Sequence, residues 1–126
     1  MSWEQPGLKI GSLTASADLS GKQYCFAVLS GAGTVNAAAA SNVQCVGVIQ
    51  NKPISGSTAE IVVNGVSKVA AGAALSVNAE VMADATGRAV TAATTGNRVQ
   101  GIALEAATAA GQIIAVLLNK GERILP

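Results

Sequence analysis

Short apolar runs alternate with small polar turns along most of the chain. The runs are rich in valine and isoleucine and cover residues 23–29, 43–49, 59–63, 66–70, 98–104 and 112–118. The turns between them contain glycine, asparagine, serine or aspartate. Short strands separated by turns at intervals of about 8–12 residues are typical of β-sandwiches and β-barrels. The pattern therefore predicts an all-β protein with a small barrel or sandwich body.

Several of these runs are apolar at both odd and even positions. Residues 24–29, with the sequence Tyr-Cys-Phe-Ala-Val-Leu, are an example. Because successive side chains of a strand point to opposite faces, such a run predicts a strand that is buried on both faces. A compact barrel satisfies this requirement, and so does a strand that a neighbouring subunit covers.

Two turns predict β-hairpins. Asn64 and Gly65 stand between two apolar runs, and both residue types tolerate the positive φ angles of a type I′ turn. We therefore expect a tight hairpin tip at this pair. Residues 84–87, Asp-Ala-Thr-Gly, predict a second hairpin between strands at 81–83 and 88–90.

Residues 1–17 differ from the rest of the chain, and we expect them to form an N-terminal arm beside a single β body at residues 18–126. Pro6 and Gly7 disfavour regular structure in this segment. Its apolar side chains have no obvious partner in the neighbouring sequence; they are Trp3, Leu8, Ile10 and Leu13. One interpretation is a disordered tail followed by a first strand. The other is an arm that adds a strand to the sheet edge of a partner.

The composition implies that other protein chains cover part of the surface. At 126 residues the chain has the size of one domain with its own core. Charged residues make up 12% of the chain, about half of the roughly 25% usual in soluble proteins. We do not expect a membrane span, because the longest apolar run, residues 113–118, is far shorter than the ~20 residues required. Residues 1–6 also lack the features of a signal peptide, so coverage by other chains remains the explanation.

Nucleic acids and metal ions are not expected as partners. The net charge is +1, the lysines and arginines are scattered, and the chain has three aromatic residues. Without histidine, Cys25 and Cys45 supply only half of a zinc site. Each cysteine lies within an apolar run, so we expect both to be reduced and buried.

The sequence also lacks catalytic motifs. It contains no nucleophile elbow, P-loop or dinucleotide fingerprint, and the commonest general base, histidine, is missing. Glu80 and Asp84 share the parity of one expected strand, but they flank a turn and are expected to be solvated edge charges. We therefore predict no enzymatic activity, no cofactor and no small-molecule substrate.

Five blocks in order resemble a family of tailed-bacteriophage capsid decoration proteins, also called cement or head-stabilising proteins. The blocks are residues 17–24, 47–53, 65–69 together with 71–72, 84–90 and 101–106. The resemblance covers roughly residues 8 to 118. It implies a small β-barrel or β-tulip body, trimers at threefold and quasi-threefold positions of the capsid, and an N-terminal arm that lies on the major capsid protein. It implies neither enzymatic activity nor a cofactor.

On this resemblance the protein is expected to be made in the cytoplasm of a bacterial host and to act on the outer surface of the virion. It would bind an assembled head and bridge subunits of the major capsid protein. The expected contacts are the arm residues Trp3, Leu8, Ile10 and Leu13, and after them a loop with Asn51, Lys52 and Pro53. A small β-barrel ligand-binding module, or a fibre or surface module, remains the alternative.

Overall fold

Every regular element of the described chain is a β-strand. The computed structural model describes residues 4–124, and it contains no helix in that part of the chain. The strands are β1 (Gln5–Ala15), β2 (Phe26–Gly31), β3 (Thr34–Ala37), β4 (Gly47–Ile49), β5 (Thr58–Ala70), β6 (Glu80–Ala83), β7 (Ala89–Thr91), β8 (Arg98–Ala103) and β9 (Ile113–Ile124). The all-β prediction is confirmed.

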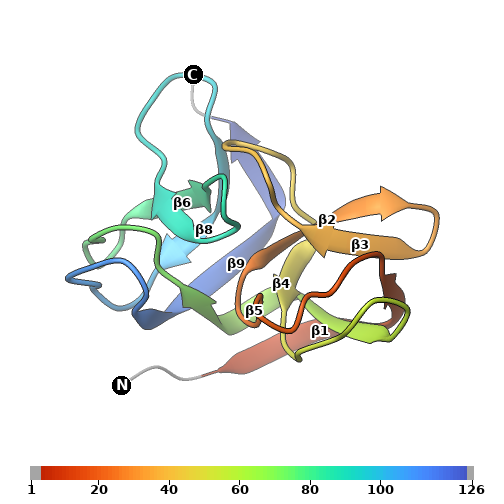
Figure 1. Ribbon diagram of the computed structural model, residues 1–126. Helices are drawn as coiled ribbons and strands as arrows, with labels where there is room; N and C mark the ends of the chain where they lie inside the picture. Colours follow the sequence, from red (N-terminus) through yellow and green to blue (C-terminus); the bar gives the residue numbers. More distant parts are fainter. Residues whose placement is uncertain (1–3, 125–126) are drawn as a thin grey trace.

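The strands form one sheet that curls into two rings. Its order is β1-β3-β2-β4-β5-β9-β8-β6-β7, and an additional pairing of β1 with β5 closes the first five strands into a barrel-like ring, called here the first ring. The remaining strands continue from β5 and curl back, because Ala89 at the start of β7 bridges to Ala71 just after β5. We call this half, β5-β9-β8-β6-β7, the second ring. Figure 1 shows β2 and β3 on one side of β5 and β6 and β8 on the other.

Strand β5 belongs to both rings and pairs along both of its edges. Its residues Gly65 and Val66 pair with β1 and also with β9, so these two strands lie on opposite edges. Ile61 and Val62 pair with β1 and with β4, which places β4 on the same edge as β9. Along that edge the partner therefore changes from β4 to β9 between Val62 and Gly65.

The hairpin predicted at Asn64 and Gly65 is wrong, because both residues lie inside the continuous strand β5. Gly65 has a positive φ of 91°, so the left-handed conformation inferred from the sequence occurs there, but within a strand. The pairing of β1 with β5 shifts register at this point, between Pro6 and Leu8. The two apolar runs do not pair with each other because β1, β4 and β9 occupy both edges of β5 instead.

Two clusters of apolar side chains fill the rings. The first-ring core consists of Ala15, Leu19, Ala27, Val35, Ala37, Ile49, Ala59, Ile61 and Val63. The second core includes Val48, Val62, Val69, Val81, Ala103, Ile114 and Val116. Adjacent residues of β5 enter different clusters, since Ile61 and Val63 belong to the first and Val62 to the second. Strand β5 is thus buried on both faces over these residues. In the run at residues 24–29 the predicted burial on both faces holds for Phe26 and Ala27, which belong to different cores, but not for Leu29, which is 59% exposed.

The second predicted hairpin is present, and it fastens one ring to the other. Strands β6 and β7 pair with Ala83 opposite Ala89, and Asp84 begins the turn between them. The Oδ1 atom of Asp84 accepts hydrogen bonds from the Thr86 amide at 2.8 Å, the Thr86 hydroxyl at 2.7 Å and the Arg88 amide at 2.9 Å. The Phe26 amide of the first ring donates to the Gly87 carbonyl at 2.7 Å. The ordered turn thus holds the second ring against β2.

We predict that the Asp84 turn makes stability depend on pH. Partial burial raises the pKa of Asp84, but the hydrogen bonds from Thr86 and Arg88 and the charge of Arg88 lower it more, so the pKa lies below its ordinary value. The resulting stabilisation is present above the unfolded pKa of about 4 and is lost as the pH falls through the lower folded pKa. In urea titrations the excess stability of the wild type over Asp84→Asn should therefore shrink between about pH 5 and pH 2. A difference that is constant over this range would contradict the assignment.

A second prediction concerns the close approach of β4 to β5. A Cβ atom on Gly47 would clash with the main-chain carbonyl oxygen of Val62 and lie 2.7 Å from Ile61 Cγ2. Because the carbonyl belongs to a paired strand, Gly47→Ala should lower the free energy of unfolding by about 1–3 kcal/mol. Gly11→Ala is the matched control, since nothing lies within 4 Å of its Cβ position. Chemical denaturation should show a change within about 0.5 kcal/mol for the control, and equal losses in both variants would refute the steric explanation.

Candidate functional site

The structure separates the apolar residues that were expected to act together in the N-terminal arm. Trp3 lies outside the described residues. Leu8 is 54% exposed, whereas Ile10 and Leu13 pack against the first-ring core. Strand β1, which carries the last three, pairs with β5 within the same chain. Of the three described apolar arm residues that the sequence singled out, Leu8 is therefore the one that is exposed.

In the loop between β4 and β5 as well, some of the expected contact residues are exposed and others have a structural role. Asn51 closes the loop, since its side-chain amide donates to the Thr58 carbonyl at 2.9 Å and its Oδ1 atom accepts from the Glu60 amide at 3.1 Å. Pro53 is buried, while Lys52 is exposed. The next residue, Ile54, is 59% exposed and was not singled out in the sequence. Lys52 and Ile54 are thus the side chains that this loop presents.

Leu8 and the loop lie near opposite ends of β1. The loop joins the C-terminal end of β1 through hydrogen bonds between Gly56 and Ala15 and between Ala15 and Ser57. Leu8 pairs with Asn64, well along β5. The seven residue-to-residue steps from Leu8 to Ala15 span roughly 23 Å in an extended strand. The two candidate contacts are therefore separate points on the first ring.

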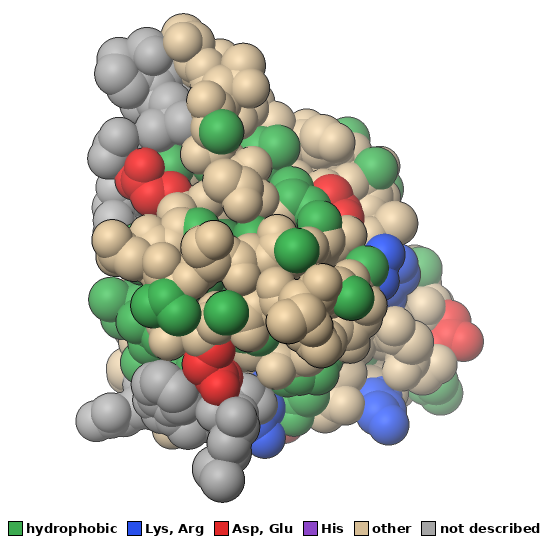
Figure 2. All heavy atoms as spheres, turned by 90° about the vertical axis from the view of Figure 1, so that its left-hand side faces the viewer, with side chains coloured by type: hydrophobic (Ala, Val, Ile, Leu, Met, Phe, Trp, Pro, Cys, Tyr) green, Lys and Arg blue, Asp and Glu red, His purple; other side chains and the backbone are tan. Residues whose placement is uncertain are grey.

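Other large apolar side chains that the sequence analysis did not select are also exposed. They are Leu29 on β2, Val77 in the loop before β6, and Ile113 and Leu117 on β9. Simple alternation would place Ile113, Ala115 and Leu117 on one face of β9, yet Ala115 is fully buried while the other two are exposed. The exposure of Ile113 and Leu117 therefore could not be predicted from alternation. The Ala115 amide donates to Glu105 Oε1 at 2.8 Å. Figure 2 shows hydrophobic side chains scattered over one face with few charged ones among them. The surface thus shows the low charge content seen in the sequence.

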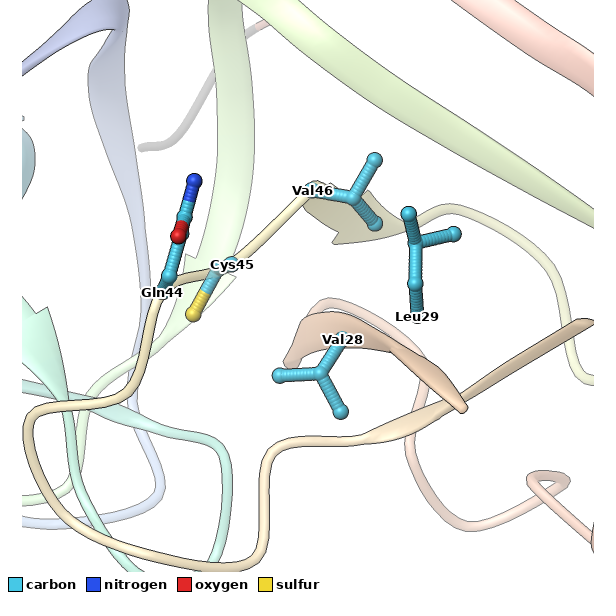
Figure 3. A pocket seen from close by; sticks show the side chains of 5 residues that line it. All are labelled: Val28, Leu29, Gln44, Cys45 and Val46. Carbon is cyan, nitrogen blue, oxygen red and sulfur yellow. The ribbon is translucent and has the colours of Figure 1, made fainter. Parts of the chain in front are cut away.

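An apolar groove opens beside β2. Its volume is about 320 Å³, and Val28, Leu29, Gln44, Cys45 and Val46 line it (Figure 3). Neither Cys45 at this groove nor Cys25 elsewhere forms a disulfide, and both are buried, as the sequence predicted. Burial raises the pKa of the Cys25 thiol despite the nearby charges of Lys22 and Arg88. That thiol therefore stays protonated and is a poor nucleophile at neutral pH.

The described residues hold no cluster suited to metal chemistry. In residues 4–124 no three histidine, cysteine, aspartate or glutamate side chains come together in a way that could hold a metal ion. Asp84, considered above with Glu80, uses its Oδ1 atom to order its own turn. Within the same part of the chain no helix is long and apolar enough to cross a membrane.

Comparisons with known proteins identify relatives of this fold. A family model described as phage cement protein matches residues 14–118. No curated protein sequence matches the chain. Among solved structures, the chain is similar to the N base of the head fibre protein gp8.5 of bacteriophage phi29, with a TM-score of 0.70 and 20% identity. The match covers 90% of this chain and 94% of that one. At this identity the similarity shows a shared fold.

The different burial of Leu8, Ile10 and Leu13 along β1 leads to a prediction for stability. Ile10→Ala and Leu13→Ala remove side chains that pack against the first-ring core, so each should lower the free energy of unfolding by about 1–2 kcal/mol. Leu8→Ala removes a largely exposed side chain of the same strand and should change it by less than about 0.5 kcal/mol. Urea denaturation of the three variants measures the difference. Similar effects in all three would mean that β1 does not dock on the ring in this register.

Proposed function

This chain belongs to the phage cement protein family, and on that premise we propose that it binds the outside of an assembled phage head and bridges neighbouring subunits of the major capsid protein. The family makes it a structural protein associated with the phage capsid. The match over residues 14–118 carries the proposal, because it includes β2 to β8 completely and so covers strands of both rings, although most of β1 lies before it. The shared fold with the N base of a phage head fibre agrees with such a role.

The surface supports a role in bridging. Exposed apolar side chains lie at separate places, with Leu8, Leu29 and Ile54 on the first ring and Ile113 and Leu117 on the second. A body with several separate contact points can touch more than one neighbour at once. When contacts are linked in this way, the later ones form intramolecularly, so weak individual contacts give firm attachment.

The proposal includes a homotrimer at threefold positions of the shell. Only 12% of the residues are charged, so much of the surface is apolar. Association of three copies would cover part of this apolar surface, and this supports the trimer. On β9, Leu117 is 41% exposed and lies in register with Val66 of β5 and Ile102 of β8. This row crosses the outer face of the second ring and is a candidate for contacts between copies.

Contacts with the shell are assigned to the first ring. Leu8 and Lys52 are exposed and can touch a partner without any change in the ring. Ile10, Leu13, Asn51 and Pro53 act indirectly in this proposal, since they hold β1 and the loop in shape. A direct role for Ile10 or Leu13 would require β1 to leave β5. Trp3 remains a candidate contact on the sequence argument alone.

The test is decoration of bare heads. Purified protein is mixed with undecorated heads of the corresponding phage, and electron microscopy should show added density at specific lattice points with threefold grouping. Decorated heads should also withstand heating better than bare ones, because bridged subunits separate less readily. Heads that stay bare at saturating protein would overturn the proposal, and density without threefold grouping would overturn the trimer.

A matched pair of variants locates the contact. Leu8→Asp and Val77→Asp each place a charge at an exposed apolar position, since the two residues are 54% and 61% exposed. Leu8→Asp should reduce occupancy on heads by about tenfold, because a charge would be buried in the contact. Val77→Asp, in a loop of the second ring, should leave occupancy nearly unchanged. The reverse order would move the shell contact to the second ring.

A further inference from the structure

Strand β2 is paired fully on one edge and only partly on the other. Towards β3 the pairing runs from Ala27 to Gly31. Towards β4 it covers Phe26 and Ala27 alone, and the last hydrogen bond on this side runs from the Val46 amide to the Ala27 carbonyl at 2.8 Å. Within residues 4–124 no strand pairs with this edge of β2 beyond that point.

The chain before β4 turns away and leaves this edge open. The Asn42 amide donates to the Ala83 carbonyl of β6 at 3.1 Å, so residues 42–46 lead from β2 towards the second ring. The groove described above lies where they diverge, between Val28 and Leu29 on one side and residues 44–46 on the other. The groove therefore lies beside the part of the β2 edge that has no neighbouring strand, beyond the hydrogen bond between Val46 and Ala27.

Apart from Gln44, the side chains that line the groove are apolar, and they lie on both faces of the sheet. Val28 packs against the second core, to which Cys45 belongs, while Val46 packs against the first-ring core. Figure 3 shows Val28 and Leu29 pointing from β2 to opposite sides, with Cys45 and Val46 directed to different sides of the neighbouring segment. Leu29 is 59% exposed. A strand entering here would find apolar neighbours for side chains of both parities.

We propose that this edge binds a short, extended, uncharged segment of the shell protein, which adds to β2 as a strand beside residues 29–31. The inference rests on the proposed function for the source of that segment. Main-chain hydrogen bonds would supply affinity, and alternate apolar side chains would pack on Leu29 and Val46 or on Val28 and Cys45. None of the five groove residues is charged, which matches an uncharged partner and would leave an ionic one without a counter-charge.

The sequence of the open edge agrees with a binding role. Proteins protect exposed edges with lysine, proline or covering loops, because an open strand edge pairs with any extended chain. Residues 28–31 are Val-Leu-Ser-Gly and contain neither lysine nor proline. The turn at Ala32 and Gly33 ends the edge, so the added strand is limited to about three residues, or roughly 10 Å.

The experiment compares two charge substitutions of equal exposure. Leu29→Asp places a carboxylate in the groove, and Val77→Asp is the control, since these residues are 59% and 61% exposed. Both variants are checked first for wild-type circular dichroism and thermal transition, and Leu29→Ser replaces Leu29→Asp if the latter is unstable. Binding to undecorated heads should weaken at least about tenfold for the groove variant and less than about twofold for the control.

Hydrogen exchange tests whether main-chain hydrogen bonds form along the open edge of β2. Peptides covering residues 28–32 should exchange more slowly in protein bound to heads than in free protein, while peptides covering residues 75–79 should not change. Slower exchange at the edge, together with weakened binding of the groove variant, supports strand addition to β2.

Three outcomes would overturn the proposal that a shell segment adds to β2. If the wild type fails to bind heads, the proposed function falls and the groove proposal falls with it. If the wild type binds and Leu29→Asp binds equally well, with no protection at residues 28–32, only the groove proposal falls. If Leu29→Asp instead abolishes self-association in sedimentation while head binding persists, the occupant is a second copy of this chain and the shell-segment proposal is wrong.

Discussion

The fold depends on one constraint, which is that β5 must serve two rings at once. Its edges pair with β1 on one side and with β4 and then β9 on the other. Its faces contribute Ile61 and Val63 to one core and Val62 to the other. Every neighbouring strand is therefore positioned against a central strand that has neither a free face nor a free edge over these residues.

The small side chains of this chain follow from that constraint. Two cores that share one strand leave little thickness for each, and both are built largely from alanine and valine. Glycine occurs where strands approach most closely: a Cβ atom on Gly47 would clash with the Val62 carbonyl, and one on Gly101 would clash with the Leu117 carbonyl. Glycine at these two positions is thus a packing requirement of the double ring, whereas Gly33, Gly56 and Gly96 have open space at the Cβ position and a positive φ that the turns require.

The thinness of the two cores also affects the surface. A thin double ring has much surface for its volume, and several large apolar side chains remain exposed on it, among them Leu29, Ile54 and Val77. Polar groups mainly organise turns, as Asn51 does for its loop and Asp84 for the β6–β7 hairpin. Asn51 and Asp84 thus fix the shape of the loops that connect the strands.

The all-β class, the Asp84 hairpin and the burial of the cysteines could be predicted from the sequence, because turn residues and side-chain parity act over a few neighbouring residues. The strand that continues through Asn64 and Gly65 could not be predicted in this way, since the local preference for a turn was outweighed by partners from distant β1 and β9. Only the tertiary structure decided that Ile10 and Leu13 face a core while Leu8 faces outward, because the register shifts of β1 break simple alternation. Which edges stay open, as at Leu29, depends on where β4 begins and on the path of residues 42–46 before it, and that is a property of the assembled sheet.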